Sequence, residues 1–314
     1  MIDVLLMGEP MVLFGATTVA PLEEVEEYKR FLAGAEVNVA IGLSRLEHTP
    51  AYVTRLGDDP FAKFIIHSLK QDNIETEYIT IDDRYLTGFQ LKGKVLAGDP
   101  PVAYFRKNSA ASHLSVADIE KIDFDTVKRV HVTGISPALS PSCMEATLYL
   151  VQTAKERGIP VSYDPNLRPV LWKDETAMRA GIHKIAPYAN LILPGISEGK
   201  LLTKKETPEE IAAFYHDMGI ETVVIKLGGE GAYASGKEGA FYQAGFQVKE
   251  VVDTVGAGDA FAVGMLSSLL EGLSLKETVI RANAIGSMQI VVPGDNDGLP
   301  TREELEAFFL RERK

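Results

Sequence analysis

The chain alternates between short, mostly apolar runs and segments with a helical period. Residues 4–7 and 51–56 form such runs and each stops at glycine, while residues 78–81 form a third short run. Between them, residues 31–46 pass through a small-residue turn into a segment with one apolar face, and residues 61–71 also have a helical period. An order of strand, helix, strand, helix, strand favours a parallel sheet.

Two stretches interrupt this alternation. Residues 12–25 are extended in character and lack a helical period. Residues 87–105 alternate apolar and polar positions and contain a turn at 97–101, which is typical of a β-hairpin. We expect a small antiparallel sheet that forms a lid, built from segments of roughly 10–30 and 86–108, within one domain of 314 residues.

The alternation returns in the second half of the chain. Polar residues or glycines follow several of its expected strands, and ligands of open α/β sheets bind at the carboxyl ends of the strands. We therefore expect Asp164, Glu198 and Gly228 to lie near one site. The expected strands are 130–132, 161–163, 191–193, 222–226, 232–235 and 240–244, and the expected helices are 142–157, 208–218, 260–270, 275–288 and 302–311.

Composition excludes several classes of protein. Apolar residues make up 46% of the chain, which suits a globular protein with a core. The net charge of −12 and the absence of a long basic run argue against nucleic acid as a partner. No stretch has the length of a membrane span, and the N-terminus does not resemble a signal peptide. The single cysteine, Cys143, permits no intramolecular disulfide, so we expect a cytoplasmic protein and a structural thiol.

One stretch carries the strongest chemical signal. Gly256, Ala257 and Gly258 directly precede Asp259, and a long apolar run follows. We expect a tight turn that leads into a buried helix, whose bare amides and positive dipole end would suit a phosphate. A carboxylate at that place would repel the phosphate, so its presence makes sense only if the reaction needs a proton acceptor there. This suggests phosphoryl transfer to a hydroxyl, with the carboxylate as the base. The alternative is that Asp259 merely stabilises a helix start, where Asp is common.

Two motifs resemble those of the ribokinase-like, or PfkB, carbohydrate kinases. The first is Ala33-Gly34-Ala35-Glu36-Val37-Asn38-Val39-Ala40, and the second is Asp253-Thr254-Val255-Gly256-Ala257-Gly258-Asp259-Ala260-Phe261. Their order and separation also match the family. The resemblance implies a three-layer α/β sandwich with a central, mostly parallel sheet and a small β-sheet lid. The chain departs from the family at Glu47, where a small residue is usual, and at Gly195, where the family tends to have Asn.

Three further stretches resemble the branch of the family that phosphorylates 2-keto-3-deoxygluconate. They are residues 104–111, 134–140 and 164–168. The resemblance implies a transfer of the γ-phosphoryl group of ATP to a primary hydroxyl of this keto-sugar acid, with Mg²⁺ as cofactor. Arg106 and Arg168 together could hold the sugar carboxylate, although either Arg alone could be a solvated surface charge.

The family resemblance also implies roles for individual residues. Asp259 would be the general base, and the backbone at Gly256, Ala257 and Gly258 would bind the transferred group. Glu198 would organise Mg²⁺ through water. The substrate-binding residues implied are Gly34, Ala35, Asn38, Phe89, Tyr104, Arg106, Ile135, Arg168 and Asp295, and the ATP-binding residues are Asp164, Asn166, Lys226, Gly228, Gly231 and Asn283.

Other functions stay open on the sequence alone. A fructokinase or another neutral-sugar kinase of the same family is the first alternative. A regulatory module that binds sugar or nucleotide without turnover is the second, and the intact Asp259 argues against it. The family resemblance also implies a homodimer formed through the lid, which the apolar residues of the lid permit.

Overall fold

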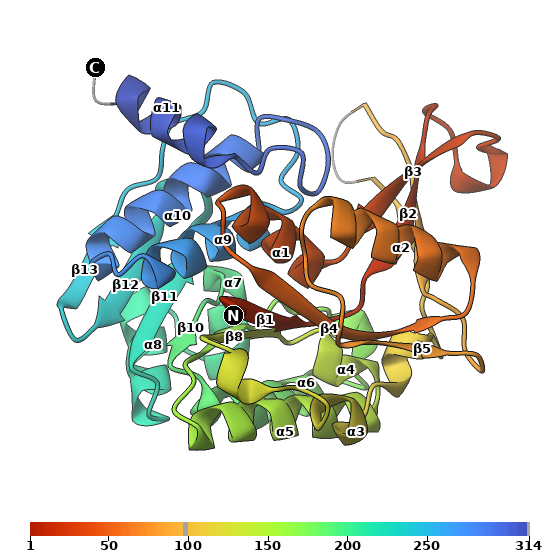
Figure 1. Cartoon of the computed structure of the whole chain (residues 1–314). Helices are drawn as coiled ribbons and strands as arrows, with labels where there is room; N and C mark the ends of the chain where they lie inside the picture. Colours follow the sequence, from red (N-terminus) through yellow and green to blue (C-terminus); the bar gives the residue numbers. More distant parts are fainter. Residues whose placement is uncertain (97–99, 313–314) are drawn as a thin grey trace.

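A computed structural model describes residues 1–96 and 100–312, and its centre is a nine-stranded sheet (Figure 1). The strand order is β13-β12-β11-β10-β9-β8-β1-β4-β5. The strands from β11 to β5 pair in parallel, and β12 and β13 are antiparallel additions at one edge. Its strands are β1 (Val4–Met7), β4 (Pro50–Gly57), β5 (Ile79–Asp82), β8 (Val130–Thr133), β9 (Val161–Asp164), β10 (Leu191–Ile192), β11 (Thr222–Lys226), β12 (Ala232–Gly236) and β13 (Gly239–Gln243).

Helices cover both faces of this sheet, because its central strands are apolar on both sides. In β1, Leu5 and Met7 belong to one hydrophobic core, whereas Val4 and Leu6 belong to the other. Strand side chains alternate between faces, so one run of apolar residues supplies both cores. The first core is covered by α3 (Val116–Ile119), α5 (Pro141–Glu156), α6 (Glu175–Ile185), α7 (Ile196–Thr203) and α8 (Pro208–Asp217), with α4 (Ser136–Leu139) in contact with α5 and α6.

The second core lies under the other helical layer (Figure 1). The long apolar run after Asp259 forms its central helix, which is buried from Ala260 to Ser268. The helices of this layer are α1 (Ala35–Arg45), α2 (Pro60–Gln71), α9 (Ala257–Leu270), α10 (Leu275–Gln289) and α11 (Arg302–Glu312). The expected three-layer α/β sandwich is confirmed.

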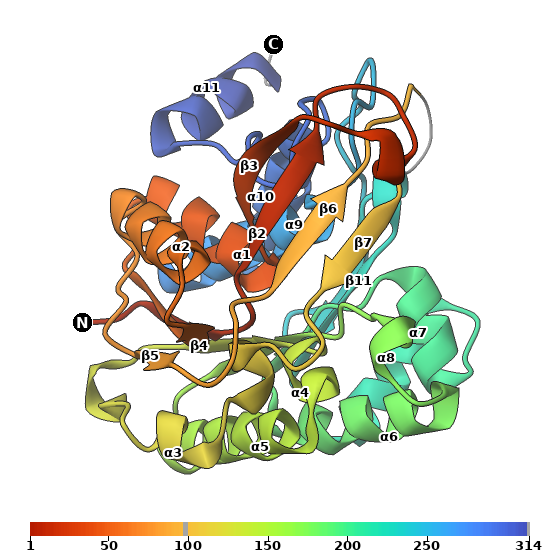
Figure 2. The same cartoon turned by 90° about the vertical axis from the view of Figure 1, so that its right-hand side faces the viewer.

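A separate sheet of four strands stands at one side of the molecule and forms the lid (Figure 2). Its order is β3-β2-β6-β7, with β2 (Met11–Ala16), β3 (Tyr28–Ala33), β6 (Phe89–Lys92) and β7 (Val102–Phe105). The expectation of a purely antiparallel lid is wrong, because β2 and β6 pair in parallel. The turn expected at 97–101 falls partly outside the described residues, since 97–99 are not described.

Several elements differ from those expected. The extended stretch at 12–25 is a strand only as far as Ala16, and the partner strand β3 was not predicted. Strand β3 is mostly exposed, so it carries polar residues such as Lys29 and Arg30 and lacks the apolar pattern that would reveal a strand. Helices α6 and α7 were also not predicted. No helix among the described residues is long and apolar enough to span a membrane.

Candidate active site

The site is built around the first turn of α9. Gly256 precedes the helix with a φ of 78°, and a Cβ at this position would lie 2.1 Å from the carbonyl oxygen of Asp295. Only glycine fits this combination of positive φ and close approach. Within the described residues, the amides of Gly258 and Asp259 have no backbone acceptor, as expected for a helix start. The turn therefore presents bare N–H groups next to the Asp259 carboxylate.

Asp259 lies half-buried between two asparagine amides. Asn38 Nδ2 donates to Oδ2 at 2.8 Å, and Asn166 Nδ2 donates to Oδ1 at 3.3 Å. Burial raises the pKa of Asp259 to about 7; the Asn38 hydrogen bond opposes this shift, and the charge of Asp164 adds to it. A carboxyl group with a pKa near neutrality is suited to accept a proton at physiological pH.

Two of the residues expected to bind ATP, Asp164 and Lys226, form an ion pair next to Gly258. Lys226 Nζ lies 2.7 Å from Asp164 Oδ2, and a Cβ at Gly258 would be 3.5 Å from the same Nζ. Burial alone would lower the pKa of Lys226, but the carboxylates of Asp164 and Glu198 raise it above its usual value. The ammonium group thus stays charged beside the bare amides of α9, where it adds positive potential.

The glycines of the predicted nucleotide side form a tight turn after β11. Gly228 and Gly231 have positive φ values of 61° and 103°, and a Cβ at Gly231 would lie 2.1 Å from the carbonyl oxygen of Gln243. Asn283 Nδ2 donates to the carbonyl oxygens of Gln243 and Ala244 at 3.3 and 3.2 Å. Asn283 therefore fixes the chain after β13 with its amide nitrogen and is not simply an exposed polar residue.

Glu198 joins two loops at the carboxyl end of the sheet. Its Oε1 accepts from the amide of Leu167, and its Oε2 accepts from the amide of Gly195, both at 2.7 Å. The carboxylate thus caps α7 and fixes the loop that carries Asn166. Among residues 1–96 and 100–312, no group of three or more His, Cys, Asp or Glu side chains could hold a metal ion by itself.

The two arginines expected to hold a sugar carboxylate differ in their surroundings. Arg106 is largely buried and already has a partner, since its Nε donates to Glu9 Oε2 at 2.7 Å. Ser109 Oγ donates to the other oxygen of Glu9 at 2.5 Å. Arg168 is exposed and forms no ion pair within the described residues, and its charge partly opposes the rise that burial causes in the pKa of Asp259. Arg168 is therefore the arginine that is open to a ligand.

The structure does not bring Phe89 to the face of the lid that carries Tyr104. In the strand register Phe89 is opposite Phe105, and Gln90 is opposite Tyr104. Phe89 stacks on Phe105, with ring centroids 4.6 Å apart, and also packs against Phe61. Phe89 therefore lies on the opposite face of the lid from Tyr104, because successive strand side chains point to opposite faces. Gln90, only 6% exposed, takes that place next to Tyr104.

The start of α1 supplies the opposite wall. Gly34 caps the helix with a φ of 142°, and a Cβ there would lie 3.0 Å from the carbonyl oxygen of Glu9. Ala35 begins the helix, and Asn38 on its first turn reaches Asp259. Ile135 is buried at the end of β8, where its amide donates to Thr133 Oγ1 at 3.1 Å.

Asp295 lies near the turn of α9 but is paired with a residue of the lid. Lys92 Nζ lies 3.0 Å from Asp295 Oδ1. The neighbouring Asn296 donates from Nδ2 to Asn38 Oδ1 at 3.0 Å. The loop that carries Asp295 and Asn296 therefore helps to orient Asn38, which in turn donates to Asp259. Asp295, expected to reach sugar hydroxyls, thus pairs with Lys92 and lies next in the chain to a residue of the hydrogen-bonded group around Asp259.

Sequence reasoning missed a set of buried acids and their partners. Glu9 lies two residues after the first strand, and Glu36 lies inside a recognised motif, so both had a signal in the sequence. Glu36 is fully buried, and Thr133 Oγ1 donates to its Oε1; burial raises the pKa of Glu36. The other missed residues near the site are Gln90, Lys92, Ser109, Thr133 and Asn296.

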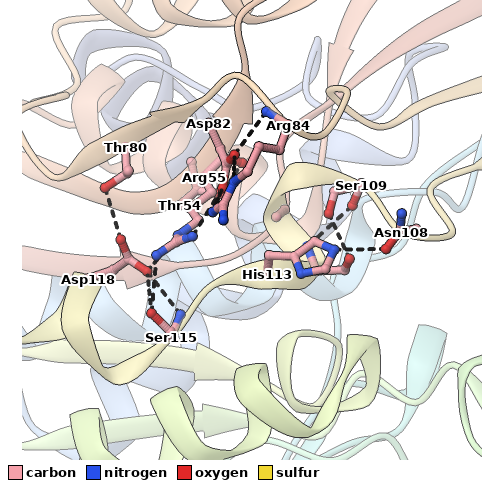
Figure 3. Close-up of polar contacts among 12 residues, drawn as sticks. Thr54, Arg55, Thr80, Asp82, Arg84, Asn108, Ser109, His113, Ser115 and Asp118 are labelled. Atoms are coloured by element: carbon pink, nitrogen blue, oxygen red, sulfur yellow. Dashed lines mark hydrogen bonds and ion pairs between the residues drawn. The ribbon is translucent and has the colours of Figure 1, made fainter.

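The segments that connect the lid to the body meet at a polar cluster around Arg55 (Figure 3). Arg55 Nε donates to Asp118 Oδ2 at 2.7 Å, and its Nη1 donates to Asp82 Oδ2 at 3.2 Å. Burial alone would raise the pKa of Asp118, but the hydrogen bond from Arg55 lowers it. The rings of Tyr85 and His113 stack 3.5 Å apart across the two connecting segments. The lid is therefore anchored to a rigid base.

A bare helix start beside a carboxyl group whose pKa lies near neutrality is an arrangement suited to phosphoryl transfer to an alcohol. The sequence profile of the pfkB family carbohydrate kinases matches residues 1–302. The chain belongs to this family.

Relatives and solved structures agree with this assignment. The chain is 44% identical to a 2-dehydro-3-deoxygluconokinase of Bacillus subtilis (strain 168), over 99% of this chain and 97% of that protein. The crystal structure of a PfkB protein from Polaromonas sp. JS666 is similar, with a TM-score of 0.90 and 42% identity, covering 98% of this chain and all of that one. A putative ribokinase II from E. coli in complex with ATP and Mg²⁺ has a TM-score of 0.91 at 25% identity, covering 99% and 100%.

Proposed function

We propose that this carbohydrate kinase transfers the γ-phosphoryl group of ATP to a primary hydroxyl of 2-keto-3-deoxygluconate, which is also called 2-dehydro-3-deoxygluconate. The observation that carries the chemistry is Asp259, whose raised pKa and place beside the bare amides of α9 suit a general base. The Bacillus subtilis relative supports this choice of sugar, because the similarity extends over nearly the full length of both chains.

In this proposal Asp259 accepts the proton of the attacking hydroxyl as the bond to phosphorus forms. General base catalysis of this kind contributes about 10²–10⁴ in rate. The amides of Gly258 and Asp259 stabilise the negative charge on the transferred group, and one such donor is worth about 3–4 kcal/mol. Asn38 and Asn166 hold the carboxylate in place, so that its geometry is set before the sugar arrives.

We also propose Mg²⁺ as the cofactor, because carboxylates that could bind it lie at the carboxyl ends of the sheet strands. Mg²⁺ keeps most of its waters and binds proteins through one or two carboxylates together with substrate phosphates. Asp164, paired with Lys226 next to Gly258, and Glu198, which accepts from two backbone amides, could each reach the ion through water. When bound, the ion would neutralise charge on the ATP phosphates. The similar ribokinase II holds ATP and Mg²⁺.

Recognition of the sugar acid falls mainly to Arg168 in this proposal. Among the described residues its guanidinium pairs with no carboxylate and donates only to the carbonyl oxygen of Leu167, whereas the Arg106 guanidinium is engaged by Glu9 on two nitrogens. Arg106 keeps free N–H groups and Tyr104 shares its side of β7, so both can complete the pocket. A guanidinium binds a carboxylate bidentately, which distinguishes a sugar acid from a neutral sugar.

The test compares sugars in the wild type and in Arg168→Ala. With ATP and Mg²⁺, the wild type should phosphorylate 2-keto-3-deoxygluconate far better than fructose. Arg168→Ala should lower kcat/KM for the acid about tenfold or more, the loss of one charge-assisted bidentate contact. Its effect on fructose should be small. An equal loss on both sugars would favour the fructokinase alternative.

The homodimer belongs to the proposal as well. The lid exposes several large apolar side chains, among them Val102, Tyr104 and Phe105, each at least 37% exposed. An exposed sheet with such residues suits a second copy of the same chain. The lid would also exclude water from the reacting groups, which limits hydrolysis of ATP.

A further inference from the structure

Lys92 is the one cation that links the inner face of the lid strand β6 to the loops around the α9 turn, as far as the described residues show. Its Nζ lies 3.0 Å from Asp295 Oδ1 and 3.7 Å from Asp253 Oδ2. All three side chains are between 15% and 22% exposed, so solvent screens their interaction only in part. Lys92 lies two residues from Gln90 and therefore on the same face of the lid as Tyr104.

Both partners of Lys92 are built into the turn that begins α9. Asp253 Oδ1 accepts from the amide of Val255 at 2.9 Å, which shapes the chain just before Gly256. Asp295 approaches the same turn through its backbone, since its carbonyl oxygen packs directly on Gly256. One lid side chain thus holds the turn from both sides.

The loop of Asp295 also reaches the proposed base. Asn296 donates to Asn38, and Asn38 donates to Asp259. Lys92 is therefore linked to Asp259 through its ion pair with Asp295, the backbone from Asp295 to Asn296, and two side-chain hydrogen bonds. Lys92 also acts through its charge. Asp253 and Asp295 would repel an incoming sugar acid and the phosphates of ATP, and the Lys92 ammonium group offsets this repulsion.

We propose that Lys92 is a positioning residue that ties the lid to the α9 turn, holding the bare amides and Asp259 in place and offsetting the two acids near the sugar. This inference rests on the proposed kinase function, and it adds a residue to which no role has been assigned. It predicts that lid closure and the geometry of the turn depend on the same ammonium group.

The test uses four variants of the full chain. Lys92→Ala and Lys92→Met should lower kcat/KM for the sugar acid about tenfold or more, in the range of ordinary coupling between sites. They should also raise the ratio of ATP hydrolysis to sugar phosphorylation, because water enters under a loosened lid. Lys92→Arg, which keeps the charge, should retain most of the activity. Lys94→Ala is the matched control, since Lys94 follows the lid strand β6 and its Nζ donates, as far as the structure describes the chain, only to the carbonyl oxygen of Thr17.

Hydrogen exchange separates this inference from the proposed function. Without any substrate, the hydrogen-bonded amides of Asp253, Val255 and Ala257 should exchange faster in Lys92→Ala and Lys92→Met than in the wild type and in Lys94→Ala. Unchanged exchange together with an unchanged ratio of hydrolysis to transfer would overturn the role of Lys92. A wild type that phosphorylates no sugar would instead overturn the kinase proposal, while the exchange measurement would still decide whether Lys92 holds the turn.

Discussion

At the scale of single residues, Asp259 combines two properties that oppose each other. The side chain lies half-buried near the negative charges of Asp164 and Glu36, which makes ionisation costly, and two asparagine amides keep the carboxylate oriented. A raised pKa also means that folded protein is less stable with Asp259 ionised than protonated. The site thus gives up some stability to hold a base that is ready near neutral pH.

The raised pKa of Asp259 predicts the pH dependence of activity. Only the carboxylate form accepts a proton, so kcat/KM should fall as pH drops below about 7 and level off above it. The Asn38 hydrogen bond lowers this pKa, so Asn38→Ala should move the falling limb to higher pH. The measurement is kcat/KM from about pH 5 to 9 for both proteins. A profile with no limb near neutrality would argue against Asp259 as the base.

The roles of residues could be predicted where a sequence motif indicates them, but contacts that depend on tertiary packing could not. Asp259 and Gly256 followed from a turn that tolerates few other residues. The pairing of Arg106 with Glu9 joins residues 97 positions apart, and no local pattern announces it. Cys143 is structural as expected: it is buried, donates to the carbonyl oxygen of Ala111, and burial raises its pKa to about 11.

At the scale of elements, the lid shows which information the sequence lacks. The alternation in 87–105 predicted two strands, but it could not show which face turns toward the site. Pairing with β2 and packing against α2 decided that Phe89 points away. At Glu47 the sequence did indicate the local structure. The family usually has a small residue at this turn, and Glu47 adopts a left-handed conformation there, with a φ of 67°.

The cluster at the base of the lid predicts a loss of stability. Arg55→Ala would leave Asp82 and Asp118, both almost fully buried, without their shared partner. Asp82 keeps Arg84 and Asp118 keeps Lys121, so the loss should be about 1–3 kcal/mol in the free energy of unfolding, as for buried acceptors that lose one donor. Arg84→Ala is the control, because Arg84 also pairs with Asp82 but is 68% exposed, and its effect should be much smaller. Urea denaturation of the two variants measures the difference, and equal losses would contradict the role of Arg55.

At the scale of the whole molecule, the order of strands and helices was sufficient to predict the layers. Apolar strands followed by helices favour a covered parallel sheet, and the same rule places the site at the carboxyl ends of its strands. Helices α6 and α7 escaped prediction because the stretch between Asp164 and Thr207 gave only the short strand β10 as a clear signal. The second sheet followed from the break in the alternation.

The exposed apolar residues of the lid predict a dimer at this scale. Sedimentation of the wild type should give a mass of about twice the 34.2 kDa of one chain. Phe105→Asp should shift the protein toward monomers, since Phe105 is half exposed and a buried charge without a partner is costly. Glu209→Ala, on an exposed helix start in the body, is the control. A wild-type monomer at all concentrations would contradict the dimer.

Phosphoryl transfer from ATP to 2-keto-3-deoxygluconate by the wild type and by Asp259→Asn is the most direct measurement. Asn preserves the size of the side chain but accepts a proton poorly, so kcat should fall by about 10² or more. The variant should fold as stably as the wild type at pH 8, since it removes the costly ionisation of Asp259. Phosphorylated sugar acid formed by the wild type and lost in a folded Asp259→Asn is the predicted result. Equal rates in both proteins, or no transfer by the wild type, would contradict it.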